Sequence, residues 1–197
     1  MTQRLVLASS NAGKLREFNS LLADFGFEVV RQADLGVSDA EETGLSFVEN
    51  ALLKARHASQ VTGLAALADD SGLVVDVLDG QPGIYSARFA GQPTNDAANN
   101  AKLLEALKDV PAEQRAARFR CCIVLVRYPT DPVPLIAEAS WEGCILTELQ
   151  GQQGFGYDPL FYLPLQACTA AELEASEKNR ISHRGQALQR LRTLLAA

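Results

Sequence analysis

Two adjacent carboxylates stand in an apolar part of the chain, in the run Asp69-Asp70-Ser71-Gly72. The flanking residues 64–68 are apolar, and so are residues 73–77 apart from Asp76, a pattern typical of buried strands. Adjacent carboxylates at a strand end repel each other and lose hydration, so a nearby cation would stabilise them. Oxygen ligands of this kind suit Mg²⁺. The alternative is a turn, in which Asp and Ser hydrogen-bond the local backbone and Gly72 takes a positive φ. The run alone does not decide between the two.

A polar loop near the N-terminus could bind an anion. Apolar residues 4–8 predict a strand, and the apolar residues of 15–25 recur at helical spacing until Gly26. The loop between them is Ser9-Ser10-Asn11-Ala12-Gly13-Lys14, where free backbone N–H groups and a lysine could hold a phosphate. It is no Walker A motif, because Ala8 and Leu15 stand where that motif requires Gly and Ser or Thr. The alternative is an Asn11 N-cap followed by an exposed lysine.

An acidic loop, Glu41-Glu42-Thr43-Gly44, precedes a second expected helix. Ser46 and Glu49 have the spacing of a capping box, which predicts that the helix begins there. Its expected buried residues are Phe47, Ala51, Leu52, Ala55, Ala58 and Val61. Another stripe at i, i+4 and i+7 carries Asn50, Lys54 and His57, and a solvated surface is the default interpretation of such a stripe.

Two segments in the second half of the chain combine residue types suited to binding. Residues 151–159 are dense in glycine and form either a strand connection or a loop against a flat ligand. In the second case Phe155 would stack on the ligand and Asp158 would accept from a base edge. Residues 178–185 form a cationic cluster in an acidic protein. A capping-box pattern from Thr169 to Glu172 predicts a short helix before them.

The remaining elements form an alternation of strands and helices around these segments. Strands are expected over residues 27–31 and 118–128, and a second long strand or a pair of strands over 135–149 that forms a β-hairpin with 118–128. A helix is expected before Pro111. Turns are expected at 79–80 and 82–83, and a mobile loop over 85–95. The inward residues of the helix before Pro111 are expected to be Leu103, Leu104 and Leu107, and those of the terminal helix Leu188, Leu191, Leu194 and Leu195.

Composition narrows the class of protein. A length of 197 residues with 47% hydrophobic and 21% charged residues fits one domain or two closely joined lobes. The net charge of −6 argues against a general nucleic-acid binder. No apolar run approaches the roughly 18 to 20 residues of a membrane span, and the N-terminus lacks a signal-peptide pattern. The four cysteines have no metal-ligand spacing, and Cys121 and Cys122 stand in an apolar strand, so we expect reduced thiols and a cytoplasmic location.

Four motifs occur together in a particular order: Ser9-x-Asn11-x-x-Lys14, Glu49-Asn50-Ala51 with Lys54, Asp69-Asp70-Ser71-Gly72, and Phe155-Gly156-Tyr157-Asp158 with Ser182-His183-Arg184. In this order they resemble the inosine/xanthosine triphosphate pyrophosphatase family, over essentially the whole chain and with no departure at a motif position. The resemblance implies an α/β fold with an elongated mixed β-sheet and flanking helices. It also implies a single domain of two lobes around a central cleft, and a homodimer.

The activity that the resemblance implies is Mg²⁺-dependent hydrolysis of dITP, ITP and XTP to the nucleoside monophosphate and pyrophosphate. Asp70 would be the general base and a metal ligand, Glu41 a second acidic ligand, and Asp69 would support the ion indirectly. Lys14 and Lys54 would neutralise the phosphates.

The resemblance implies substrate contacts in every motif. Hydrogen bonds from Ser9 and Asn11 would reach the phosphates, and donors from Lys178, His183 and Arg184 would favour a 6-oxo purine and leave adenine mismatched. The other substrate-binding positions that it implies are Ser10, Ala12, Gly13, Ser71, Phe155, Gly156, Tyr157 and Asp158.

Two other functions fit parts of this pattern. A related nucleotide pyrophosphatase could prefer another base, such as a modified pyrimidine, and would then ignore ITP and XTP. A nucleotide-sensing module would bind ITP without turnover. The acidic pair and Lys14 favour catalysis over sensing, because a sensor has no need of an activated water.

Overall fold

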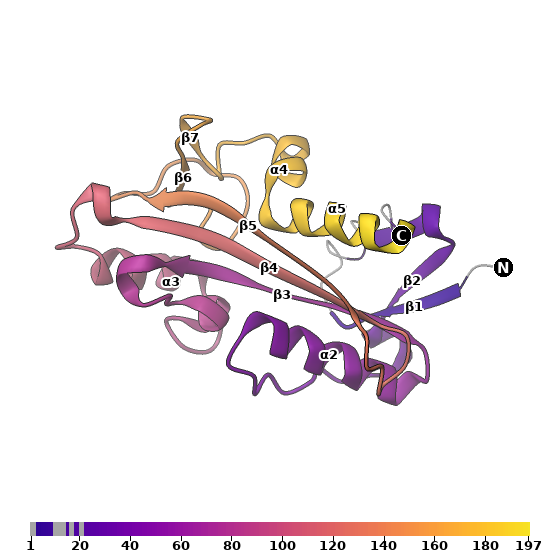
Figure 1. The fold of residues 1–197 in the computed structure, drawn as a ribbon. Coiled ribbons are helices and arrows are strands. Elements are labelled where there is room, and N and C mark those ends of the chain that lie inside the picture. Colours follow the sequence, from indigo (N-terminus) through magenta and orange to yellow (C-terminus); the bar gives the residue numbers. More distant parts are fainter. Residues whose placement is uncertain (1–2, 10–14, 16–17, 20–21) are drawn as a thin grey trace. The chain divides into compact units, whose positions relative to one another are not determined.

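A computed structural model describes residues 3–9, 15, 18–19 and 22–197 of the chain. Seven strands form one mixed sheet in the order β2-β1-β3-β4-β5-β6-β7 (Figure 1). The strands are β1 (Gln3–Leu7), β2 (Phe27–Arg31), β3 (Ala65–Val75), β4 (Ala116–Val126), β5 (Leu135–Ile145), β6 (Phe161–Leu163) and β7 (Cys168–Thr169). β1 runs parallel to β2 and β3, whereas β5–β6 and β6–β7 are antiparallel pairs. The predicted mixed sheet with flanking helices is confirmed.

The chain divides into two compact units. Unit 1 comprises Met1–Asp70, Cys121–Ala139 and Gln186–Ala197, and unit 2 comprises Ser71–Arg120 and Ser140–Gly185. Strands β3, β4 and β5 contribute residues to both units, and β3 divides between Asp70 and Ser71.

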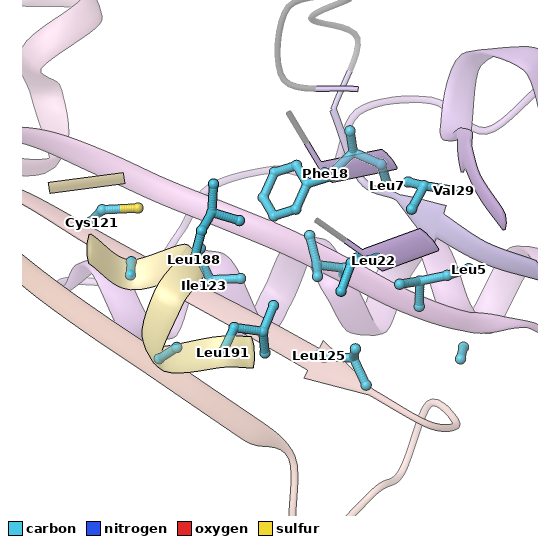
Figure 2. Close-up of a cluster of buried hydrophobic side chains, with 14 of the residues drawn as sticks. Leu5, Leu7, Phe18, Leu22, Val29, Cys121, Ile123, Leu125, Leu188 and Leu191 are labelled. Carbon is cyan, nitrogen blue, oxygen red and sulfur yellow. The ribbon is translucent and has the colours of Figure 1, made fainter. Parts of the chain in front are cut away.

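Strict alternation along the strands gives unit 1 two buried layers. One layer comprises Leu5, Leu7, Leu67, Ile123 and Leu125 with Phe18, Leu22, Leu188 and Leu191 (Figure 2). The other comprises Val6, Ala66, Ala68, Val124 and Val126 with Ala51, Ala55 and Ala58 of α2 (Phe47–Thr62). Because successive strand residues point to opposite faces, α2 and α5 (His183–Ala196) cover opposite sides of the sheet in this unit (Figure 1).

Helix α2 begins where its capping box predicts. The Ser46 hydroxyl oxygen accepts a bond from the Glu49 N–H at 3.4 Å, and the Glu49 carboxylate accepts from the Leu45 N–H at 2.9 Å. The Glu49 carboxylate also accepts from the Ser46 hydroxyl at 2.7 Å. The predicted buried face is confirmed at Ala51, Ala55 and Ala58, and is wrong at Val61, which is 56% exposed near the end of the helix.

Unit 2 has a single apolar core. Its buried residues include Leu73, Val75, Phe119, Trp141, Tyr157, Leu160 and Phe161, with Leu103 of α3 (Asp96–Ala106) and Leu107 directly after that helix. Helix α4 (Ala175–Ile181) precedes α5, with Ser182 between them. None of the described helices is long and apolar enough to cross a membrane.

Several local expectations are wrong. The Thr169 amide and hydroxyl both donate to the Glu172 carboxylate, at 2.7 and 3.0 Å, yet this pair closes a turn after β7 and α4 begins only at Ala175. The segment expected as a loop over 85–95 begins inside a 3-10 helix, Gly83–Arg88. Leu194, expected inward, is 41% exposed. The turn at 79–80 is confirmed, because Asp79 and Gly80 have φ of 51° and 85°.

Candidate functional site

The acidic run lies inside a strand and forms no turn. β3 continues without interruption from Ala65 to Val75, and Gly72 is not among the described glycines with positive φ. The turn alternative is therefore wrong. As whole residues, Asp69 and Asp70 are 2% and 9% exposed. Strand alternation directs their side chains to opposite faces of the sheet. Asp70 shares the face of Ala66 and Ala68, which is the face that α2 covers.

Lys54 of α2 bridges two carboxylates on this face. Its Nζ donates to Asp70 Oδ1 at 2.7 Å and to Glu42 Oε1 at 2.9 Å. The three side chains are largely withdrawn from solvent, with exposed fractions of 16% for Lys54, 11% for Asp70 and 26% for Glu42. The expectation of a solvated stripe is thus wrong for Lys54. It is also wrong for Asn50, which is fully buried and accepts from the Gly44 N–H at 2.9 Å.

Burial and neighbouring charges shift the pKa values of both Asp70 and Lys54. Burial raises the pKa of Asp70, Lys54 opposes that rise, and the nearby carboxylates Glu42 and Asp69 add to it. Burial alone would lower the pKa of Lys54, but Asp70 and Glu42 outweigh it, so the lysine pKa is raised and the ammonium is retained. Lys54 is thus a charged lysine shared by the Asp70 and Glu42 carboxylates.

This group has the chemistry of a partial cation site. Asp70 Oδ2 is buried and has no hydrogen-bond partner among the described residues. Oxygen donors of this kind fit a hard divalent ion. Within the described part of the chain, no three Asp, Glu, His or Cys side chains gather closely enough to hold a metal by themselves.

The two residues of the acidic loop differ in their surroundings. Glu42 is committed to Lys54, whereas Glu41 is exposed and makes no ion pair or hydrogen bond with any described residue. Sequence reasoning missed Glu42, because two adjacent glutamates in a loop give no sign of which one turns inward. The proposed role of Glu41 as a metal ligand stays a prediction.

The glycine-rich loop of unit 2 is held by its own carboxylate. Asp158 is 3% exposed, and its Oδ2 accepts from the Phe155 N–H at 2.8 Å and from the Lys178 ammonium. The Lys178 Nζ also lies 4.9 Å from the centroid of the Phe155 ring, and Phe155 is 66% exposed. The loop thus presents an aromatic ring to solvent beside a cation. The predicted acceptance from a base edge by Asp158 is untested, and in this structure that oxygen binds within the loop.

Two further contacts fix the middle of this loop. The Tyr157 hydroxyl donates to the Ser86 carbonyl at 2.8 Å, and its ring is 4% exposed within the core. Gly156 has φ of 61° and is bonded through its backbone to α3. Tyr157 therefore anchors the loop, while its neighbour Phe155 projects from it.

The cationic cluster divides between core and polar contacts. The His183 ring stacks on Phe119 with centroids 4.9 Å apart and planes at 14°, and on Trp141 at 6.4 Å and 23°. Arg184 Nη2 donates to Ser71 Oγ at 3.4 Å, which brings together two residues of the predicted substrate site that are far apart in the sequence.

Of the predicted phosphate loop, residues 9–14, the structure describes Ser9. Ser10, Asn11, Ala12, Gly13 and Lys14 lie outside the described residues. Ser9 follows β1, and its N–H donates to the Leu7 carbonyl at 2.8 Å.

Sequence reasoning missed two polar residues that hold the glycine-rich loop, Asp96 and Asn100. The signal for Asn100 was present: it shares a helical stripe with Leu103 and Leu107 at i+3 and i+7, so a polar side chain stands at a core position. A buried polar residue in such a stripe needs a specific partner.

Fold and site together define a class: an α/β protein with an open mixed sheet, whose buried carboxylates and lysine suit cation-assisted chemistry on an anionic ligand. The chain matches the Ham1 family over residues 5–194 and belongs to that family.

Individual relatives agree with this assignment. The chain is 62% identical over 195 residues to a dITP/XTP pyrophosphatase of Xanthomonas oryzae pv. oryzae, covering 99% of this chain and 98% of that one. It is 59% identical over 189 residues to a dITP/XTP pyrophosphatase of Escherichia coli K12, covering 96% of each chain. The structure of a HAM1 protein from Coxiella burnetii matches with a TM-score of 0.95 and 50% identity, covering 100% of this chain and 99% of that one.

Proposed function

We propose that the protein is a nucleoside-triphosphate pyrophosphatase that hydrolyses non-standard purine nucleoside triphosphates, dITP, ITP, XTP and dXTP. The products are the nucleoside monophosphate and pyrophosphate, and the reaction removes deaminated purines from the nucleotide pool. The observation that carries the proposal is the identity of 62% over 99% of the chain to a protein named dITP/XTP pyrophosphatase. The buried carboxylate and lysine group in unit 1 supports it, because the reaction needs both a base and charge neutralisation.

Asp70 acts as the general base in this proposal. The oxygen of a water attacks the α-phosphorus, the bond from that phosphorus to the bridging oxygen breaks, and pyrophosphate leaves. Lys54 holds Asp70 Oδ1 at 2.7 Å, which leaves Oδ2 to accept the proton from the attacking water. The raised pKa of Asp70, caused first by burial, suits a carboxylate that must hold that proton.

In this proposal Asp70 would also be a ligand of a magnesium ion. When bound, it neutralises charge on the phosphate oxygens and makes water a better nucleophile. Glu41 is the second ligand in this proposal, because its carboxylate makes no bond to a described residue, whereas that of Glu42 is engaged by Lys54.

The remaining positions divide between phosphate and base. Lys14 and Lys54 neutralise the triphosphate, with hydrogen bonds from Ser9 and Asn11 and from the backbone of the loop that contains them. Lys54 would exchange part of its bonding to Glu42 for a phosphate oxygen. For the base, Phe155 offers an exposed ring to stack on, and Lys178, His183 and Arg184 supply donors for a 6-oxo group.

A substrate panel tests the proposal. Pyrophosphate release is measured with dITP, XTP, dATP, dGTP and dTTP, each with and without Mg²⁺. We expect dITP and XTP to be cleaved with Mg²⁺ and dATP to be cleaved poorly, because its 6-amino group meets donors instead of acceptors. Cleavage of all five at similar rates, or tight ITP binding with no pyrophosphate release at any Mg²⁺ concentration, would refute it.

Two further properties belong to the same proposal, a homodimeric state and a cytoplasmic location. Light scattering of the purified protein tests the first, because a dimer would have twice the 21.2 kDa mass of the chain. Fractionation of cells that express the full chain tests the second.

A further inference from the structure

Gly156 is bound through both of its backbone polar groups to one helix. Its N–H donates to Asp96 Oδ2 at 2.7 Å, and its carbonyl accepts from Asn100 Nδ2 at 2.8 Å. Asp96 is the first residue of α3, and Asn100 lies one turn further along. The two side chains therefore hold one peptide segment of the glycine-rich loop from both sides.

Asn100 is itself fixed in orientation. It is 5% exposed, and its amide nitrogen donates a second bond to the Asp96 carbonyl at 2.9 Å. Both amide protons are thereby used, one within the helix and one on Gly156. A buried amide held in this way has little freedom to follow a moving loop.

The position of Gly156 in the loop gives these bonds a further consequence. On one side Tyr157 is anchored in the core through Ser86, and on the other Phe155 is 66% exposed. Gly156 has φ of 61°, and Gly154 has φ of 79°, so this backbone has more conformations open to it than a chain of bulkier residues would. The direction of the Phe155 ring therefore depends on how Gly156 is held, besides the bond of the Phe155 N–H to Asp158 and the contact of its ring with Lys178.

We propose that Asp96 and Asn100 are positioning residues, which hold the Phe155 ring in the orientation that stacks on the purine base. The inference rests on the proposed function, because it takes the base to bind at this ring. The bonds to Gly156 order the loop when the protein folds, so that the cost of ordering it does not fall on substrate binding. If one residue of the loop were free and had to be ordered on binding, the affinity for substrate would fall roughly tenfold.

The same helix offers a matched control. Asn99 is 2% exposed and also uses its side chain on a neighbouring segment, donating to the Ala87 carbonyl at 3.0 Å and accepting from the Ala90 N–H at 2.7 Å. It makes neither of the two bonds to Gly156. Asn99→Ala therefore removes a buried amide from α3 without releasing the loop.

The experiment compares Asn100→Ala, Asp96→Ala and Asp96→Asn with Asn99→Ala in the full chain. We expect Asn100→Ala and Asp96→Ala to raise KM for dITP about tenfold while kcat changes less than about twofold, because the phosphate chemistry is untouched. Asp96→Asn keeps an oxygen that accepts from Gly156 and should restore most of the affinity. Amide hydrogen exchange should speed up over residues 154–158 in the two alanine variants and stay unchanged there in Asn99→Ala.

Each result for KM and hydrogen exchange supports or overturns the inference. Faster exchange in the loop with an unchanged KM would overturn the inference, and so would a loop whose exchange does not respond to Asn100→Ala. An equal rise of KM in Asn99→Ala would reduce the effect to general damage to α3 and would also overturn it. If the wild-type protein cleaves no purine triphosphate, the proposed function itself fails. If the wild type is active and the variants have the same KM, only the inference about Asp96 and Asn100 fails.

Discussion

Replacing Asp70 with Asn should stabilise the protein while abolishing turnover. Burial raises the pKa of Asp70, and Glu42 and Asp69 add to the effect of burial. A carboxyl group with a raised folded-state pKa holds its proton more tightly in the folded chain than in the unfolded one. Its ionised form therefore costs stability as the pH rises from the unfolded value of about 3.9 through the folded value, and the full cost is present above that. Asparagine removes this cost and keeps an oxygen for Lys54.

The size and sign of the effect depend on which member of the ion pair is removed. In Asp70→Asn, Lys54 keeps its bond of 2.9 Å to Glu42, so no buried charge is left alone and we expect a gain of about 1 kcal/mol in the free energy of unfolding. In Lys54→Met, Glu42 and Asp70 lose their shared cation, and we expect a loss of about 3 kcal/mol at pH 7. That is the lower end for a broken buried pair, because the Glu42 side chain is 26% exposed and partly screened.

Urea unfolding followed by far-UV circular dichroism measures both changes. Fluorescence of Trp141 alone would not serve, because that residue belongs to unit 2 and the substitutions lie in unit 1. Pyrophosphate release from dITP is measured on the same samples. An Asp70→Asn variant that is less stable than wild type would refute the argument from the raised pKa of Asp70. One that turns over dITP at a near-normal rate would refute the assignment of the base.

Three further perturbations address other parts of the site and the fold. Glu41→Gln should raise the Mg²⁺ concentration needed for half-maximal activity about tenfold without changing stability, which a titration of activity with Mg²⁺ measures. Glu42→Gln should instead lower the free energy of unfolding by about 1 kcal/mol, which urea unfolding measures. Lys14→Ala should raise KM for dITP with a smaller effect on kcat, and steady-state kinetics with an unchanged KM would contradict the phosphate-loop interpretation. Asp131→Asn should lower Tm at pH 7, because the Arg127 guanidinium first, and backbone N–H groups after it, hold the pKa of Asp131 well below its usual range. Since that stabilisation is present above about pH 4 and is lost as the pH falls toward the folded pKa, the Tm of the variant should depend less on pH in acid than that of wild type.

Where local signals and burial agree, the sequence was a sufficient guide to the fold. Strand β2 occupies the predicted residues 27–31, and α2 begins after Ser46 because the capping box and the apolar face specify the same start. Where they disagree, burial decided. The Thr169 N–H donates to the Glu172 carboxylate, which is one of the two bonds of a capping box, but the Glu172 N–H donates to the Thr169 carbonyl and not to its hydroxyl. The segment after them contains no amphipathic turn to extend, so no helix follows.

The same competition explains the errors at the site. Asp, Ser and Gly favour turns through local hydrogen bonds, but the pairing and burial available to β3 in a seven-stranded sheet outweigh those bonds, so the run 69–72 is extended. Asn50 and Lys54 were expected in solvent because their side chains are polar. In the structure one is tied to the Gly44 N–H and the other to two carboxylates, neither of which helical spacing alone could reveal.

The extended form of this run also determines what each of its residues can do. In a turn, Asp70 and Ser71 could point into one small space and share a ligand. In a strand their side chains leave opposite faces, and the contacts follow that rule: Asp70 pairs with Lys54 of α2, whereas Ser71 accepts from Arg184 at the start of α5. A shift of β3 by one residue would exchange these faces and bring Ser71 to the lysine. The alternation of side chains along β3 therefore requires the acid at position 70 and the hydroxyl at position 71. Exchanging Asp70 and Ser71 should remove the ion pair with Lys54 while the amino-acid composition stays the same.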